Sequence, residues 1–223
     1  IITALGTVML PRISSILAEG NEKKIHEYIY KSIRFVSFLS FPMWLGLMCI
    51  GNTFSILYFG PLFEKTGILI IFLSSTIPFI AFANVLRTQY LIPKEMDKIY
   101  IKSVSLGAVT NLILNIILIP IYSSIGACIG TIVAEVTVML YQSIAVRKEL
   151  DIKRYINSMV PFFIKAVIMG VIVYMLNYIQ INDYFRLILQ IGLGGTIYSL
   201  LNIKYILSII NLKNIKKKLV KNE

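Results

Sequence analysis

Residues 103–142 read SVSLGAVTNLILNIILIPIYSSIGACIGTIVAEVTVMLYQ and contain one charged side chain, Glu135. The stretch consists of two long apolar runs that are separated only by the short segment YSSI at 122–125. A helix needs about 20 apolar residues to cross the hydrocarbon core of a bilayer. The stretch therefore predicts two transmembrane helices joined by a tight turn, with a carboxyl group inside the second helix.

Hydrophobic segments of similar length occur along the whole chain. Of its 223 residues, 57% are hydrophobic and only 15% are charged, and the mean hydropathy is +0.78. A soluble domain has about 25% charged residues. We therefore predict an all-α, polytopic transmembrane helix bundle of about seven helices, near residues 1–17, 37–57, 68–91, 101–120, 125–145, 159–179 and 185–206.

The first of these segments looks like the end of a helix, because the chain opens with Ile1-Ile2-Thr3 and has no basic leader. We expect the chain to be the C-terminal part of a larger protein.

Basic residues lie almost entirely on one side of this predicted topology. Cytoplasmic loops carry an excess of Lys and Arg, and all of the 22 basic residues except Lys65 and Arg186 fall on the same side. We therefore place this side in the cytoplasm, together with a basic tail at 207–223. The tail is expected to contact anionic membrane lipids rather than nucleic acid.

Residues 22–36 precede the second segment and show a different pattern. Charged residues occupy most of its faces. On the remaining face, four apolar residues recur at helical spacing: Ile25, Ile29, Ile33 and Val36. This pattern is typical of an amphipathic helix at a membrane interface. We expect residues 22–36 to lie on the cytoplasmic surface and to lead into the next span.

Small and polar residues form stripes inside the fourth and fifth segments. Lipid-facing helices need no polar side chains, so such stripes indicate either helix packing or a water-filled cavity. In the fourth segment, the residues of the stripe recur every four positions: Ser103, Gly107, Asn111 and Asn115. Both explanations stay open for this stripe.

In the fifth segment, a small-xxx-small ladder predicts close packing against another helix: Gly126, Gly130 and Ala134. Thr131 and Glu135 lie on the polar face beside this ladder. Two prolines, Pro42 and Pro78, fall inside other spans and predict kinks, which transporters often place at cavities and hinges.

Glu135 is predicted to lie near mid-membrane, where an unpaired charge is costly. Arg87 is the other charge that looks buried. It lies about 6 Å from the cytoplasmic end of its segment, against about 15 Å for Glu135. Three explanations stay open: an ion pair with Arg87, a partner outside this chain, or a neutral carboxyl group that donates a hydrogen bond. A carboxyl group that changes its charge with its surroundings is also a candidate proton or cation carrier.

Four stretches carry a family resemblance: GTVMLPRIS (6–14), LYFGPLFEKTG (57–67), NVLRTQYLIP (84–93) and LNIILIPIYSSIGACIGTIVAE (114–135). They resemble the polysaccharide-biosynthesis export proteins, the O-antigen-type flippases of lipid-linked oligosaccharides, in the multidrug and oligosaccharidyl-lipid exporter superfamily. The resemblance implies two lobes of six helices that face each other across a central cavity. Residues 1–145 would then supply most of the second lobe, and 146–206 two trailing helices.

The resemblance implies a transporter rather than an enzyme. It would move undecaprenyl-linked oligosaccharide repeat units across the bacterial cytoplasmic membrane for surface polysaccharide biosynthesis. The expected partners are that lipid-linked substrate, membrane lipids and an N-terminal lobe of the same protein. No cofactor, metal ion or catalytic residue is expected. The residues expected to line or support the cavity are Asn84, Arg87, Asn111, Asn115, Thr131 and Glu135.

Two other classes of function are alternatives to the flippase. A cation-coupled multidrug exporter with the same fold would need more buried carboxylates than Glu135 alone. A membrane enzyme such as a polymerase or glycosyltransferase usually carries a long outer loop or a cytoplasmic domain with acidic catalytic residues. The predicted outer loops here are short, with only Glu64 and Asp183 acidic.

Overall fold

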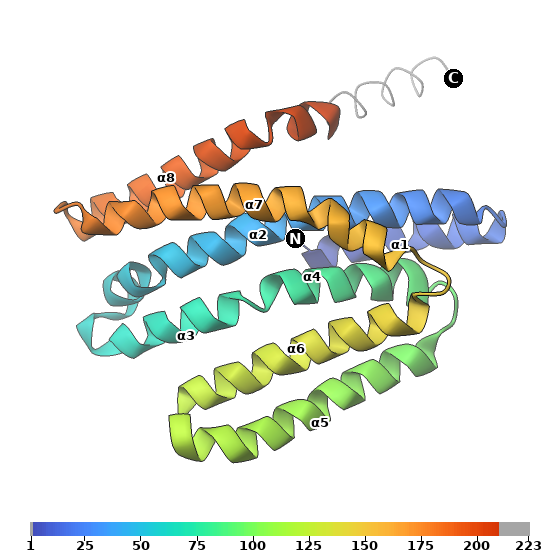
Figure 1. Ribbon diagram of the computed structural model, residues 1–223, viewed down its shortest axis with the longest axis horizontal. Coiled ribbons are helices and arrows are strands. Elements are labelled where there is room, and N and C mark those ends of the chain that lie inside the picture. Colours follow the sequence, from blue (N-terminus) through green and yellow to red (C-terminus); the bar gives the residue numbers. More distant parts are fainter. Residues whose placement is uncertain (1, 210–223) are drawn as a thin grey trace.

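The structure is a computed structural model that describes residues 2–209, and every regular element in that range is a helix or helical turn (Figure 1). The predicted basic tail at 207–223 lies outside the described residues from position 210 to its end. The elements are, in order, α1 (Ile2–Ala18), α2 (Glu22–Phe59), the 3-10 turn η1 (Pro61–Phe63), α3 (Glu64–Ser74), α4 (Ile77–Leu86), the π turn η2 (Arg87–Leu91), α5 (Asp97–Tyr122), α6 (Ser124–Val146), α7 (Ile152–Met175), the 3-10 turn η3 (Leu176–Tyr178) and α8 (Asp183–Leu201).

Six helical stretches in the described range are long and apolar enough to cross a membrane. They are Glu22–Phe59, Pro61–Leu91, Asp97–Tyr122, Ser124–Val146, Ile152–Tyr178 and Asp183–Leu201. Many large apolar side chains on α5, α7 and α8 point outward, away from the protein. In water this surface would be unfavourable, whereas in lipid it is expected. The predicted all-α bundle is confirmed, and the protein is a multi-pass membrane protein.

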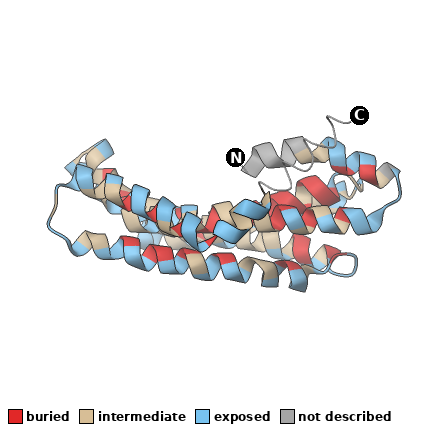
Figure 2. Ribbon diagram, turned by 90° about the horizontal axis from the view of Figure 1, so that it is seen from above, coloured by how far each residue is buried: buried red, intermediate tan, exposed pale blue. Residues whose placement is uncertain are grey.

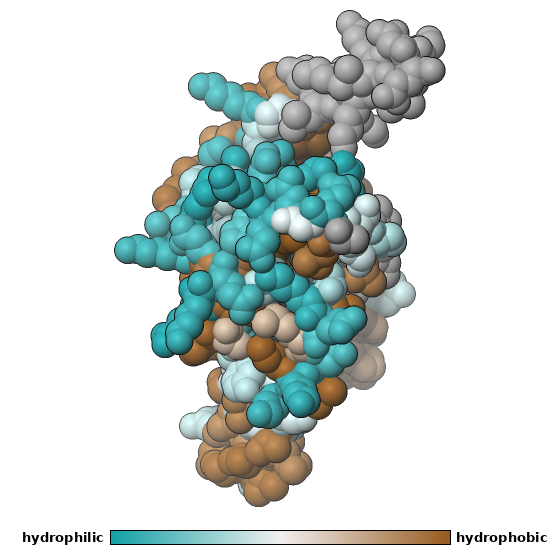
Figure 3. Space-filling view, turned by 90° about the vertical axis from the view of Figure 1, so that its right-hand side faces the viewer, coloured by the Kyte–Doolittle hydropathy of each residue, from teal (hydrophilic) through white to brown (hydrophobic). Residues whose placement is uncertain are grey.

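Helix α2 lies at the centre of the bundle. It packs against α3, α4, α7 and α8, while α5 packs mainly against α6. Figure 1 shows the resulting order: the α5–α6 hairpin forms one edge and the α7–α8 pair the other. The loops that follow α1, η2 and α6 lie together at one end of the bundle, and Figure 3 shows hydrophilic side chains gathered there. This is the end for which the sequence predicts a cytoplasmic location.

Residues 22–36 are helical as expected and continue without a break into the next span, while their place at the membrane surface stays a prediction. They are the first turns of α2, which has 38 residues and begins at Glu22. The preceding residue, Asn21, is the N-cap, and its side chain accepts a hydrogen bond from the Lys24 N–H. Such a helix is about 57 Å long and exceeds the roughly 30 Å hydrocarbon core. The four apolar residues that were expected to face the membrane are instead buried in the protein core: Ile25, Ile29, Ile33 and Val36.

The core that buries these residues lies toward the hydrophilic end. It combines α2 with α1, α4 and the segment between α6 and α7, including Phe82, Leu86 and Leu150. Figure 2 shows large buried stretches at this end. A second cluster joins α2 to α7 and α8 through Phe41, Phe162 and neighbouring residues. The two clusters hold α2 fixed against both edges of the bundle.

The third predicted span is broken into α3 and α4. At the break, the hydroxyl groups of Ser74, Ser75 and Thr76 each donate to the backbone carbonyl three residues earlier, at 2.7 Å. Pro78 follows and has no N–H to continue the helical ladder. A disruption was predicted at Pro78, and the structure confirms it. By contrast, α2 continues as one helix through Pro42.

Candidate functional site

The end of the broken span carries two of the predicted site residues. Asn84 lies in the last turns of α4, and Arg87 begins the π turn η2. The Thr88 hydroxyl donates to the Asn84 carbonyl at 2.7 Å, and the Ile92 N–H donates to the Arg87 carbonyl at 2.9 Å. Because a π turn widens the helix by one residue, it re-aims the side chains it carries, and such turns often occur at functional sites.

Arg87 points toward α5 and is half-buried. Its Nη1 donates a hydrogen bond to the Tyr100 hydroxyl at 3.2 Å, and its guanidinium carbon lies 5.5 Å from the centre of the Tyr100 ring. The Arg87 Nε is buried and has no hydrogen-bond partner among the described residues. An aromatic ring thus holds the cation in place. The buried Nε cannot reach a ligand, whereas Nη2 makes no hydrogen bond to a described residue and can serve an anion.

A cavity of about 170 Å³ lies in front of Arg87, between α4, α5 and α6. Its polar lining residues are Asn84, Arg87, Tyr100, Glu135 and Gln142, and its other walls are apolar. The structure therefore brings together three of the six predicted site residues from two distant parts of the sequence: Asn84, Arg87 and Glu135. Arg87 and Glu135 share this cavity without forming an ion pair in the described structure.

The other three predicted residues lie farther along the contact between α5 and α6. The Asn111 Nδ2 donates to the Thr131 hydroxyl at 3.4 Å, and the Asn115 Nδ2 donates to the Asn111 Oδ1 at 3.0 Å. The Asn115 Oδ1 is buried and has no hydrogen-bond donor in the described range. These side chains join the two helices, which is the packing explanation left open by the sequence.

The glycine ladder explains how α5 and α6 approach so closely. A Cβ atom at Gly126 would lie 2.4 Å from the Leu118 carbonyl oxygen, and one at Gly130 would lie 2.4 Å from the Asn115 Oδ1. A side chain larger than hydrogen does not fit at either position without movement. The predicted close packing of this ladder is confirmed.

Two polar residues of the cavity, Gln142 and Tyr100, were not among the predicted site residues. Gln142 lies two turns beyond Glu135 on α6, and its Nε2 donates to the Ser103 hydroxyl at 3.0 Å. Its position on the polar face of the fifth segment could have indicated that Gln142 belongs to the site. Tyr100 lies at the start of α5 among charged residues, where nothing in the sequence distinguishes it from an interfacial tyrosine.

Comparisons with known proteins agree with this architecture. The family described as "Lipid II flippase MurJ" matches residues 1–193. The curated protein "Lipid II flippase MurJ" of Bacillus subtilis is 22% identical over 210 residues, covering 88% of this chain and 39% of that protein. The "Probable flippase AglR" of Haloferax volcanii is 24% identical over 199 residues, covering 88% of this chain and 42% of that protein.

A solved structure of a lipid II flippase MurJ in an inward closed conformation has the same fold. It superimposes with a TM-score of 0.76 at 20% sequence identity, covering 92% of this chain and 43% of that chain. This chain thus spans about two fifths of the length of the relatives it matches.

The resemblance found in the sequence is confirmed for flippases in general, whereas the comparisons do not support its narrower assignment to the O-antigen type. Since the family match covers most of the sequence, the chain belongs to the lipid II flippase MurJ family.

Proposed function

We propose that this chain supplies the second lobe of a flippase that moves an undecaprenyl-linked saccharide across the bacterial cytoplasmic membrane. The observation that carries the proposal is the cavity at the broken third span, where Arg87 keeps free donors inside a transmembrane bundle. Discontinuous helices that present charged groups at membrane depth are typical of transport sites. In this proposal the hydrophilic end of the bundle and the C-terminus face the cytoplasm.

The chemistry of the cavity fits an anionic head group. Arg binds phosphate oxygens through N–H donors of its guanidinium group, and the Arg87 Nη2 makes no hydrogen bond to a described residue, while Nη1 bonds Tyr100. Asn84 and Gln142 add amide groups that can bond either phosphate or sugar hydroxyls. Arg87 therefore takes the phosphate of the carrier lipid, and the amides support it.

Glu135 has a different proposed role, because a carboxylate repels the phosphate that Arg87 attracts. It lies in the same cavity without an ion pair to Arg87. A group in this position couples transport to a proton or a sodium ion, because it neutralises its charge by binding one. Export that continues undiminished after the substitution Glu135→Gln would remove Glu135 as the coupling group.

Two saccharide cargoes fit this site, and each has its own support. The names of the relatives favour the peptidoglycan precursor lipid II, and the four stretches in the sequence favour an oligosaccharide repeat unit. Both carry the undecaprenyl phosphate linkage that Arg87 would bind. Depleting the protein and identifying the lipid-linked saccharide that accumulates on the cytoplasmic side distinguishes them.

The cation-coupled multidrug exporter of the same superfamily is the second candidate function. Its cationic cargo needs carboxylates, and the cavity holds Glu135 together with the Arg87 cation. Arg87→Gln separates the two functions: it lowers export of an anionic saccharide lipid, whereas it raises export of a cationic dye if the protein is a drug exporter.

A further inference from the structure

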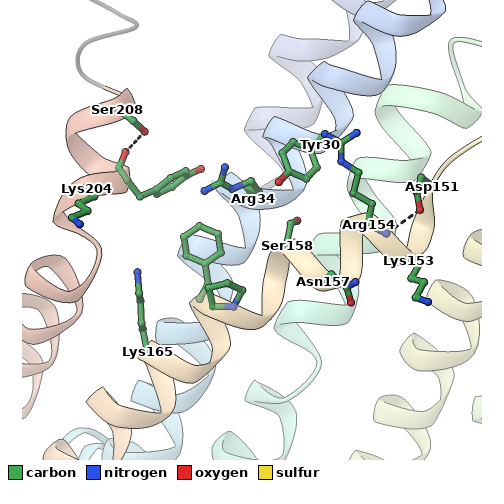
Figure 4. A pocket seen from close by; sticks show the side chains of 13 residues that line it. Tyr30, Arg34, Asp151, Lys153, Arg154, Asn157, Ser158, Lys165, Lys204 and Ser208 are labelled. Atoms are coloured by element: carbon green, nitrogen blue, oxygen red, sulfur yellow. Dashed lines mark hydrogen bonds between the residues drawn. The ribbon is translucent and has the colours of Figure 1, made fainter.

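A second and larger cavity lies between α2, α7 and the helical turns that follow α8 (Figure 4). Its volume is about 860 Å³, and it shares no lining residue with the cavity in front of Arg87. Five cationic side chains line it, on all three of these walls: Arg34, Lys153, Arg154, Lys165 and Lys204. We call it the basic cavity.

The charges of the basic cavity are not balanced within the described structure. Its one acidic residue is Asp151, whose Oδ1 already accepts a hydrogen bond from the Arg154 backbone N–H at 3.0 Å as the N-cap of α7. None of the five cations forms an ion pair with a described residue. Clustered cations repel one another, so a bound anion would stabilise this arrangement.

Arg34 is the cation that α2 supplies, and it is half-buried. Its guanidinium carbon lies 5.0 Å from the centre of the Tyr205 ring and 5.7 Å from those of Tyr30 and Phe162. Aromatic faces hold a cation in position and use none of its N–H donors. The Arg34 fork is therefore fixed in place and open to an anion.

Lys165 and Lys204 complete the opposite walls. The Lys165 Nζ donates to the Asn202 Oδ1 at 3.2 Å, which leaves two of its three donors for another partner. Figure 4 shows Arg34 and Lys165 pointing toward the space between α7 and the chain beyond α8, with Lys204 across from them. The three positive groups thus border one space.

A separate apolar groove lies farther along α2, α7 and α8, and it shares no lining residue with the basic cavity. It has a volume of about 420 Å³, and it is lined by Leu39, Met43, Met169, Val173 and Tyr198 among others. The Phe38 ring packs on both, because its centre lies 5.4 Å from that of Tyr198 in the groove and 5.4 Å from that of Tyr205 in the basic cavity. A phosphate head in the basic cavity with hydrocarbon chains along the groove suits an amphiphile better than a free phosphate ion.

We propose that the basic cavity binds the phosphate head group of an anionic phospholipid of the cytoplasmic leaflet. Basic pockets between helices on the cytoplasmic side are suited to such head groups. The proposal rests on the orientation given under the proposed function. It assigns a resident lipid rather than the transported one, because the basic cavity lies on other helices than the cavity in front of Arg87.

Trp44, the only tryptophan of the chain, gives a local readout. It lies ten residues after Arg34 on α2, about 15 Å along the helix, and stacks on Phe163 of α7. The purified protein is reconstituted into phosphatidylcholine nanodiscs that contain increasing fractions of phosphatidylglycerol with brominated chains. Trp44 does not line the groove, whereas its neighbour Met43 does, so quenching of Trp44 fluorescence reports lipid chains around this part of α2 and α7. Brominated phosphatidylcholine measures non-selective contact.

The wild-type protein is expected to reach half-maximal quenching at a lower mole fraction of brominated phosphatidylglycerol than of brominated phosphatidylcholine. Arg34→Gln weakens this preference about fivefold, since a basic residue near an anionic lipid surface contributes ~1 kcal/mol. Lys204→Gln gives a similar loss through an exposed side chain that does not support the core. The matched control is Lys102→Gln, an exposed lysine on α5, which leaves the preference unchanged.

Two results would overturn the proposal. Equal quenching by the two brominated lipids in the wild type means that the cavity does not select an anionic head group. Removal of the quenching by undecaprenyl diphosphate, added at the same mole fraction as phosphatidylglycerol, assigns the cavity to the carrier lipid instead. Neither readout depends on export, so a failure here leaves the proposed flippase function intact.

Discussion

The two cavities of this protein differ in how they hold positive charge. In front of Arg87 one cation, one carboxyl group and two amides share about 170 Å³ between closely packed helices. The basic cavity gathers five cations in about 860 Å³ between α2, α7 and the turns that follow α8. A transported molecule must be released, which favours few and balanced contacts, whereas a resident lipid is held better by many unbalanced ones.

The difference also follows from the packing on each side. Near the turn of the hairpin, Gly126 and Gly130 let α5 touch α6 closely. A Cβ atom at Gly107 would lie 2.5 Å from the Val138 Cγ2, and Val138 lines the cavity in front of Arg87. At the other edge, a Cβ atom at Gly192 of α8 would meet nothing within 4 Å. The smaller cavity is therefore bordered by the closely packed pair α5 and α6.

The largest effect is expected for Arg87→Gln, which removes the cation from the cavity that Arg87 shares with Asn84 and Glu135. Hydrogen bonds to charged groups contribute roughly 1.5–3 kcal/mol, so export should fall about tenfold to a hundredfold. Arg87→Lys keeps the charge but loses the two-donor fork, and it should recover part of the activity. The measurement is the amount of saccharide lipid that reaches the outer leaflet, normalised to protein in the membrane.

A smaller loss is expected for Glu135→Gln, which keeps the shape of the side chain and removes its charge. Export should lose its dependence on an imposed proton or sodium gradient, while the uncoupled rate persists. Export measured with and without each gradient tests this. A variant that still responds to the gradient as the wild type does would place the coupling group elsewhere.

Gly126→Ala tests the close packing of α5 against α6. The new methyl group would meet the backbone of Leu118, which cannot rotate away, so the fold should lose about 1–3 kcal/mol. Gly192→Ala in α8 is the matched control. It meets nothing within 4 Å and should be neutral or stabilising by up to ~1 kcal/mol. Thermal unfolding midpoints in detergent compare the two, and equal midpoints would contradict the packing described for α5 and α6.

The smallest effect concerns a polar network at the hydrophilic end. The Tyr90 hydroxyl donates to the Glu149 carboxylate, and the Lys94 Nζ lies 3.4 Å from it and 3.3 Å from the Glu22 carboxylate. The hydrogen bond from Tyr90, and then the Lys94 ammonium, hold the pKa of Glu149 below its usual value of 4.5.

A lowered carboxyl pKa in the folded state means that the unfolded chain binds the proton more tightly. The stabilisation is then complete above pH 4.5 and is lost as the pH falls through the lower, folded-state pKa of Glu149. Glu149 is partly exposed, so solvent weakens the effect. The unfolding midpoints of wild type and Glu149→Gln should differ slightly at neutral pH and converge in acid. A difference that grows in acid would contradict this sign.

Much of the fold could be predicted because each apolar run is long enough to be recognised by itself as a membrane-spanning helix. The predicted spans 101–120 and 125–145 became α5 and α6 with ends shifted by four residues or fewer. The division of the third span was harder to predict, since it depends on hydroxyl groups at 74–76 that bond backward to the chain. The burial of Ile29 was missed because α1 and α4 cover it, and a helical pattern does not show which neighbour will do so.

The candidate site was predicted residue by residue but not as a group. Asn84, Arg87 and Glu135 stood out as polar residues in apolar surroundings, and the structure places them around one cavity. Their meeting depends on α6 lying beside α4, which the sequence does not specify. The basic cavity was hidden for the same reason: its cations were assigned to one side of the membrane, but not to one space.

The central claim is that the two cavities bind different lipids, and a crossed measurement on two variants tests it most directly. Export and phosphatidylglycerol-selective quenching of Trp44 are measured for Arg87→Gln and Arg34→Gln in parallel. We expect Arg87→Gln to lose export and to keep the selective quenching. We expect Arg34→Gln to lose the selective quenching, with a smaller loss of export than Arg87→Gln shows. Equal losses of both properties in both variants would contradict the account, because they would mean that one lipid occupies one connected site.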